Sequence, residues 1–190
     1  MDDDISDLSD TINPKSSQLN ADDLAVIPSM TIKVTAVKKG SKEQPIAIEY
    51  EGMNEGRPFK PCLTMRRVLF AAWSQDGNKW VGRSMKLYCD PTVKFGGALV
   101  GGIRISALSD IKKPIRLLLS TSKAKRSEYN INKLEPYPDK EFNEKHLNWI
   151  AAIKEGKMTI NEVVEKASAL NGPLTDDQIE ILKGAINNDS

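Results

Sequence analysis

The sequence predicts a mainly β fold with some α structure: a small antiparallel β-barrel with one internal helix, followed by a short helical segment. Short runs of alternating polar and apolar residues recur between residues 30 and 135, which is typical of half-buried strands. Four glycines fall within seven consecutive positions in the middle of the chain, as expected where turns separate strands. We therefore divide the 190 residues into an acidic, disordered arm (1–29), a β domain (30–135) and a helical extension (136–190).

The arm has the composition of a disordered segment. It is rich in Asp, Ser and Asn and lacks aromatic residues, so it cannot bury enough apolar surface to fold alone. Two interpretations stay open: a solubilising tail, or an acidic segment that competes for a polyanion site on the β domain. Ile5, Leu8 and Ile12 are spaced by three and four residues and could form one helical turn on a partner.

The β domain contains six clear strand patterns. Its central stretch is residues 80–104, where Lys86 and Tyr88 fall on the strand face opposite the apolar residues. Two glycine pairs follow and fit tight turns, bulges or a close approach of another backbone. The predicted strands are residues 30–38, 45–51, 83–89, 103–105, 115–120 and 129–134.

One helix is expected inside the β domain, at residues 64–73. Thr64 can cap its first turn, and an apolar stripe of Met65, Val68, Leu69 and Ala72 would face the core. Phe70 and Trp73 lie on another side of this helix, and aromatic residues at such positions more often pack in a core than bind a ligand.

The helical extension follows a hinge at residues 135–139. Its apolar spacing predicts helices at residues 141–154, 159–170 and 175–186. Thr159 and Glu162 have the spacing of a capping box, in which each side chain bonds the other residue's backbone N–H.

Charge is segregated along the chain, although the formal net charge is only +1. Residues 1–30 carry seven acids and one base, net −6; residues 31–135 carry twenty bases and nine acids, net +11; residues 136–190 carry six bases and ten acids, net −4. A basic middle between acidic ends predicts a polyanion-binding core.

Basic and aromatic residues interleave in the β domain, and this combination is typical of single-stranded nucleic-acid binding. Lysines and arginines would contact phosphates, and aromatic rings would stack on bases. We expect the main contacts from Lys86, Tyr88, Lys94, Phe95 and Arg104. Secondary phosphate contacts are expected from Arg66, Arg83, Lys112, Lys113, Lys123 and Arg126. The strand count fits a small barrel or a sandwich, and on these functional grounds the OB-fold is preferred. The alternative to nucleic-acid binding is a sheet corner whose lysines are merely solvated.

Several other kinds of site are not expected. Cys62 and Cys89 indicate a reducing compartment without a disulfide framework, and neither has an activating base that would make a reactive thiol. The single histidine, His146, has no cysteine near it in the sequence, so structural zinc is not expected.

Enzymatic sites are also not expected. The glycine pairs lack the lysine and hydroxyl partners of a phosphate-binding loop. Glu49 and Glu51 share a strand face and Asp90 could join them in a metal-dependent nuclease, but two acids two residues apart on a strand are usually solvated. We predict a protein that is not an enzyme and uses no cofactor or metal.

Two parts of the chain resemble known phage proteins. The run YPDKEF at 137–142, followed by Trp149, GKMT at 156–159 and LTDDQI at 174–179, resembles the C-terminal tail of phage RecT-type annealing recombinases and neighbouring recombination proteins. It covers about 50 residues and does not fix the role of the main domain.

The β domain, in the runs WVG at 80–82 and GGIRIS at 101–106, is similar to uncharacterised phage proteins of the single-stranded DNA-binding type. This resemblance implies an OB-type barrel that protects single strands. Many such proteins end in an acidic tip that recruits partners, whereas residues 187–190 carry one acid, so recruitment through the C-terminus is not implied here.

The first functional hypothesis is a non-enzymatic single-stranded DNA-binding protein of phage replication or recombination, acting in the bacterial cytoplasm. The alternatives are an annealing recombinase or its accessory, and a protein-binding inhibitor or adaptor of a host nuclease or defence system. Partners would be single-stranded DNA, other phage replication or recombination proteins contacted through the arm or the extension, and further copies of the chain. No secretory leader or membrane segment is expected.

Overall fold

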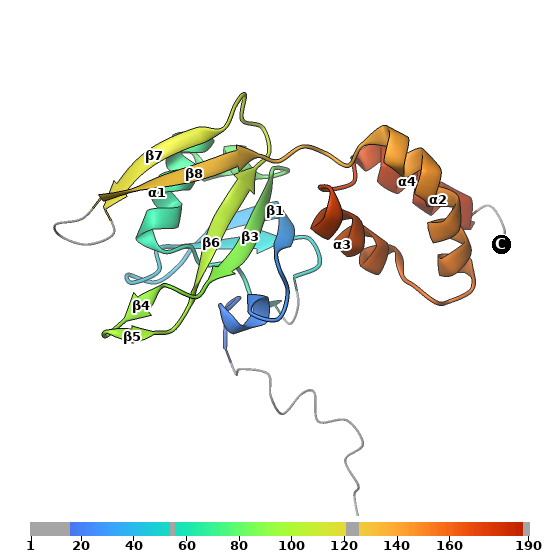
Figure 1. The fold of residues 1–190 in the computed structure, drawn as a ribbon. Coiled ribbons are helices and arrows are strands. Elements are labelled where there is room, and N and C mark those ends of the chain that lie inside the picture. The colour runs from blue at the N-terminus through green and yellow to red at the C-terminus, as the bar shows by residue number, and fades with distance from the viewer. Residues whose placement is uncertain (1–15, 54–55, 121–125, 188–190) are drawn as a thin grey trace, which may run out of the picture.

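The computed structural model describes residues 16–53, 56–120 and 126–187. Six strands form one sheet, two short strands form a hairpin, and the extension is helical (Figure 1). The strands are β1 (Met30–Lys39), β2 (Ile46–Tyr50), β3 (Ser84–Asp90), β4 (Lys94–Phe95), β5 (Ala98–Leu99), β6 (Gly102–Leu108), β7 (Ile115–Ser120) and β8 (Arg126–Lys133). The helices are α1 (Leu63–Ala72), α2 (Asp139–Lys154), α3 (Ile160–Leu170) and α4 (Asp176–Asn187), with short 3-10 turns η2 (Asp22–Leu24) and η4 (Gly77–Trp80).

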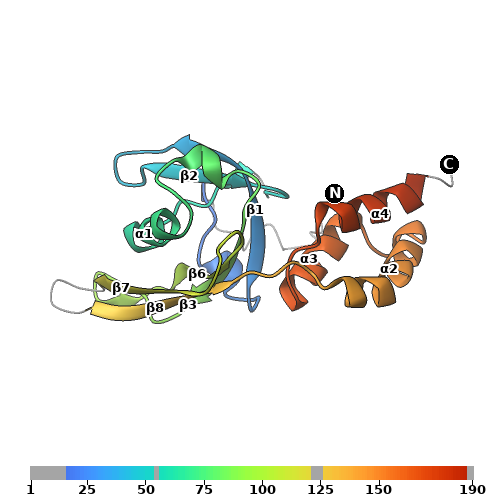
Figure 2. The ribbon, with the colours of Figure 1, turned by 90° about the horizontal axis from the view of Figure 1, so that it is seen from above.

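The six-stranded sheet is mostly antiparallel and stays open. Its order is β2-β1-β3-β6-β8-β7, with β6 and β8 running parallel. A closed barrel was expected, but among the described strands β2 and β7 are the two edges and do not pair. Figure 2 shows that the sheet bends around β1 into two layers and that α1 occupies the opening between β2 and β7. A register shift between Val34 and Ala36 in β1 provides a local bend of the kind a bulge produces.

A single apolar core fills the space between the two layers. Its fully buried side chains include Ile32, Ile48, Met65, Leu69, Met85, Leu87, Ile105 and Ile131. The predicted α1 stripe is confirmed for Met65, Val68 and Leu69. The predicted cap is corrected, because α1 begins at Leu63 after Cys62, which makes no side-chain capping bond, and Thr64 lies within the first turn.

Residues 16–29 differ from the disorder expected of the whole arm. Leu19 and Leu24 are buried in the β-domain core, and the Arg57 Nη1 atom donates to both carboxylate oxygens of Asp23, at 3.0 and 3.1 Å. This contact joins positions 34 residues apart, so local composition could not reveal it. Residues 16–29 therefore pack with the β domain, and residues 1–15 lie outside the described part of the chain.

The helical extension has a core of its own. It consists of Tyr137, Phe142, Ile150, Val163, Ala167, Leu174 and Leu182. The predicted capping box is confirmed: Glu162 N donates to Thr159 Oγ1 at 3.2 Å, and Thr159 N donates to Glu162 Oε2 at 2.6 Å. The extension touches the β domain along β1, where Lys33 Nζ lies 2.7 Å from Asp176 Oδ1.

Candidate nucleic-acid interface

Strands β3 and β6 bring three of the predicted residues together on one face. Tyr88 lies directly opposite Arg104 in the antiparallel register, and Lys86 lies one strand repeat away from Tyr88. The side chains of Leu87 and Ile105, which alternate with them, point into the core. Directly opposed side chains such as Tyr88 and Arg104 lie about 5 Å apart, and residues two apart in a strand share a face. Lys86, Tyr88 and Arg104 therefore form one polar and aromatic strip, which we call the β3–β6 strip, with a register shift between Lys86 and Leu87.

Arg104 is held in place by two contacts. Its Nε lies 3.7 Å from Asp90 Oδ2, and its Nη1 donates to Cys62 Sγ at 3.3 Å. Burial alone would raise the pKa of Asp90, but hydrogen bonds from Thr92 and the charge of Arg104 hold it below its ordinary value. An arginine has five N–H donors, so this anchored guanidinium retains donors for a phosphate.

Tyr129 on β8 packs against the core, and its hydroxyl neighbours Tyr88 of the strip, a contact that sequence reasoning missed. Its hydroxyl donates to the Ile105 carbonyl at 2.8 Å and lies 3.7 Å from Met65 Sδ. Burial, followed by the neighbouring Tyr88 hydroxyl, raises the pKa of Tyr129 above its ordinary value, so the phenol stays neutral. Tyr129 and Ile131 share one face of the predicted strand 129–134, and this pattern gave no sign that Tyr88 lies nearby. The contact depends on how β8 docks beside β6.

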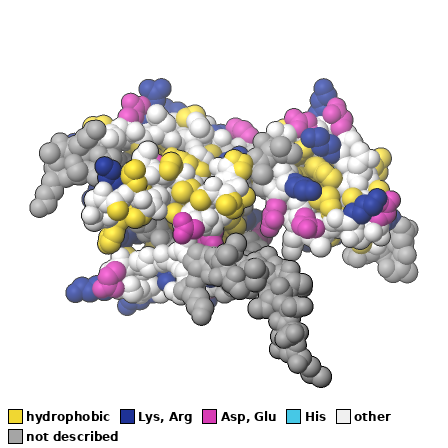
Figure 3. Space-filling model, turned by 60° about the horizontal axis from the view of Figure 1, so that its bottom comes forward, with side chains coloured by type: hydrophobic (Ala, Val, Ile, Leu, Met, Phe, Trp, Pro, Cys, Tyr) yellow, Lys and Arg dark blue, Asp and Glu magenta, His cyan; other side chains and the backbone are white. Residues whose placement is uncertain are grey.

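Strands β4 and β5 form a hairpin between β3 and β6 (Figure 1). Its turn is Gly96–Gly97, and both glycines have positive φ, at 58° and 90°, as two-residue hairpin turns of type I′ require. Phe95 is 81% exposed, and Lys94 beside it is also exposed. Figure 3 looks onto the side from which the hairpin projects: hydrophobic side chains gather there, with Lys and Arg at the margin.

The remaining predicted residues divide between two ends of the sheet. Because β8 runs parallel to β6, Arg126 at its start lies toward the sheet end that carries the hairpin, but the two strands pair only at Ala107–Leu108 with Asn132–Lys133. Arg83, which precedes β3, and Lys112 and Lys113, which follow β6, lie at the opposite end. Arg83 is placed over the Trp73 ring, 5.7 Å from its centroid. Lys123 lies outside the described residues.

Arg66 lies on α1, one turn after Cys62, whose sulfur contacts Arg104. Its Nε is buried and has no hydrogen-bond partner among the described residues. The hairpin end therefore gathers the β3–β6 strip, Lys94, Phe95, Arg126 and the first turn of α1, whereas Arg83, Lys112 and Lys113 belong to another surface.

The acidic residues that could suggest a nuclease do not converge. Glu49 is paired with Lys38 at 2.6 Å and Glu51 with Lys33 at 3.7 Å, while Asp90 is engaged by Arg104 and Thr92. Within the described ranges, no group of three or more His, Cys, Asp or Glu side chains is placed to hold a metal ion. Cys62 and Cys89 are not joined in a disulfide.

In comparisons with known proteins, no family model, no curated protein and no solved structure matches this chain. Across the residues that the structure describes, no helix has both the length and the apolar character needed to cross a bilayer.

Proposed function

We propose that this protein binds single-stranded DNA at the hairpin end of its open sheet and is not an enzyme. The observation that carries the proposal is the β3–β6 strip, in which Tyr88 and Arg104 pair across two strands, together with the exposed Phe95 on the hairpin that links these strands. Aromatic rings beside cations suit a strand whose bases are unpaired, because each base can stack while its phosphate meets a positive charge. Paired bases in a duplex would not offer their faces to Phe95.

The wider setting of this proposal comes from the sequence resemblance. An OB-type ancestry would account for a curved sheet that carries single strands on its surface, and the resemblance of the extension to phage recombination tails points to phage replication or recombination. The protein would coat single strands in the bacterial cytoplasm, and the extension would contact partner proteins. These assignments rest on resemblance and chemistry together.

A salt titration with labelled single- and double-stranded oligonucleotides tests the proposal. If Lys86, Lys94, Arg104 and Arg126 each neutralise one phosphate, affinity for a single strand should fall about 50-fold between 50 and 200 mM salt. Fluorescence anisotropy measures this directly. Salt-independent binding, or tighter binding to duplex, would contradict the proposal, and strand-annealing activity in a parallel assay would favour the annealing alternative over simple coating.

A further inference from the structure

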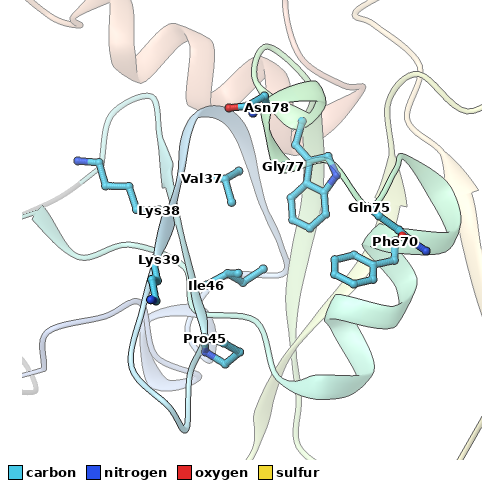
Figure 4. A pocket seen from close by; sticks show the side chains of 10 residues that line it. Val37, Lys38, Lys39, Pro45, Ile46, Phe70, Gln75, Gly77 and Asn78 are labelled. Atoms are coloured by element: carbon cyan, nitrogen blue, oxygen red, sulfur yellow. The ribbon is translucent and has the colours of Figure 1, made fainter.

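A second surface feature lies beyond the hairpin end, at the other end of α1. A pocket of about 360 Å³ opens between the β1–β2 hairpin on one side and α1 with η4 on the other. Figure 4 shows the Phe70 ring facing Ile46 and Pro45 across this pocket, with Val37 above them. The volume lies at the lower end of the range of about 300–1,000 Å³ typical of small-ligand sites. It is therefore suited to one flat ring system rather than to a larger ligand.

Phe70 is the unusual member of an aromatic cluster. Its ring centroid is 5.9 Å from that of Trp80, and Trp80 is 6.1 Å from Trp73. Trp73 and Trp80 are buried, as core residues should be, yet Phe70 is 47% exposed and lines the pocket. A phenyl ring supported by Trp80 and open to a pocket with apolar walls is a ready stacking platform.

Polar groups at the rim fit the rest of a nucleotide. The Gln75 side-chain amide lines the pocket and makes no hydrogen bond within the part of the chain that the structure describes, so it has donors and an acceptor for the edge of a base. Lys39 also lines the pocket and is exposed. Lys38 beside it is tied to Glu49 at 2.6 Å, which leaves Lys39 as the main phosphate contact.

Helix α1 links the pocket to the proposed DNA site. Cys62, at the start of α1, contacts Arg104 of the β3–β6 strip. Phe70 lies eight residues further along the same helix, which is about 12 Å at the rise of an α-helix. Arg66 lies between them. A strand that leaves the hairpin end along α1 therefore reaches the pocket after passing a cation.

We propose that this pocket captures one base of the bound single strand, stacked on Phe70, with Lys39 on a flanking phosphate. The inference rests on the proposed single-strand binding and adds a specific second subsite to it. Helix α1 would then contribute to DNA binding as well as fill the opening of the sheet.

The experiment compares Phe70→Ala, Phe70→Leu and Phe70→Tyr in the full chain, with Leu147→Ala as the control for removing an exposed apolar side chain elsewhere. Binding to an oligothymidine is measured by anisotropy, beside a matched oligonucleotide of abasic sites that keeps every phosphate. Loss of one stacked base should weaken oligothymidine binding about 5- to 150-fold in the Ala and Leu variants. Phe70→Tyr and Leu147→Ala should bind as the parent does, and on the abasic strand all variants should bind equally.

The outcomes separate the pocket from the general binding function. If the parent protein does not bind single strands, both proposals fail. If it binds and Tyr88→Ala weakens it while Phe70→Leu does not, only the pocket proposal fails. Phe70→Leu keeps the apolar contact with Trp80, so it tests stacking even if Phe70→Ala does not fold. In addition, a DNA strand that carries iodouracil should crosslink to a pocket residue of the parent protein on irradiation. Crosslinks confined to the hairpin end would also overturn the pocket proposal.

Discussion

The β domain and the helical extension differ in charge, in core and in the kind of surface they present. Residues 31–135 carry net +11 and residues 136–190 carry net −4. Each region encloses its own apolar core. Between them lies a cleft of about 980 Å³ bordered by β1, α3 and α4, and it is bridged by polar contacts such as Lys33–Asp176 and the Thr31 hydroxyl with the Ser168 carbonyl. From this contrast we expect the proposed DNA-binding chemistry to belong to the β domain and the extension to be a separately stabilised module.

The largest test of this comparison is a matched pair of core substitutions. Leu87 in β3 and Leu182 in α4 are both fully buried, one in each core. Replacing either by Ala should cost about 2–5 kcal/mol in the free energy of unfolding of its own region. Leu87→Ala should therefore abolish DNA binding once the β domain begins to unfold, while Leu182→Ala should unfold α2–α4 and leave single-strand affinity nearly unchanged.

Hydrogen exchange localises each effect, because amides of the damaged region should lose protection while those of the other region keep it. Trp149 is a second reporter for the extension, since its ring packs 5.7 Å from Tyr137 and 6.1 Å from Phe142. Loss of protection throughout the chain in Leu182→Ala would mean that the two regions fold as one cooperative unit. This result would contradict the separate stability of the β domain and the extension.

A smaller effect is expected at the surface of the β domain. Tyr88→Ala should weaken single-strand binding about 5- to 150-fold, because it removes one stacking ring beside Arg104. Tyr88→Phe is the matched control: it keeps the ring, loses only the hydroxyl near Tyr129, and should bind nearly as well as the parent. Anisotropy gives the affinities and thermal unfolding checks that both variants fold. Equal affinity of parent and Ala variant would remove Tyr88 from the site.

The parts that could be predicted from sequence are those fixed by neighbours along the chain. The capping box at Thr159 and the α1 stripe of Met65, Val68 and Leu69 depend on spacings of three and four residues, and both are present. A continuous apolar run likewise located β7 at residues 115–120 with its bounds unchanged. Local propensity and periodicity suffice for such features.

What sequence patterns could not supply was the meeting of distant segments. The parallel pairing of β6 with β8 and the insertion of α1 between β2 and β7 leave the sheet open, whereas the number of short strands and the expected function had predicted a barrel. The Asp23–Arg57 pair fixes residues that composition assigned to a disordered arm. At the candidate site, Tyr129 and Phe70 were underrated for the same reason, because a tyrosine in an alternating strand and a phenylalanine on an amphipathic helix both look like ordinary core residues.

A third test sharpens the boundary between the two regions. The hydrogen bond to Lys33 holds the pKa of Asp176 below its ordinary value of 3.8, and the bond to Asp176 raises the pKa of Lys33 above 10.5. On the Asp176 side, the attraction is fully present above pH 3.8 and is lost as pH falls through the lowered pKa of Asp176. On the Lys33 side, it is fully present below pH 10.5 and is lost as pH rises through the raised pKa of Lys33. Docking should be constant from about pH 5 to 9.

Because Asp176 is mostly exposed, the pair should contribute no more than about 1 kcal/mol and weaken in salt. In Asp176→Asn, amide shifts of β1 and α4 in NMR spectra should change while DNA affinity stays the same. Lys157→Gln, which breaks the exposed Lys157–Glu155 pair after α2, is the control and should leave the β1 shifts in place. A change in DNA affinity on Asp176→Asn would show that the extension shares in binding.

The smallest expected effect concerns the acidic segment before Ser16, which carries five aspartates and one lysine, net −4. If it competes with DNA for the cations of the hairpin end, its deletion should tighten single-strand binding by about two- to threefold at low salt, and the gain should vanish at high salt as screening removes the competition. A variant with the five aspartates changed to asparagine keeps the length and should behave like the deletion.

Deleting residues 1–29 instead would also remove Leu24 from the β-domain core and Asp23 from its ion pair with Arg57. This longer deletion should therefore lower the thermal midpoint of unfolding. Unchanged affinity on removal of residues 1–15 would leave that segment as a solubilising tail and would confine all control of DNA binding to the β domain itself.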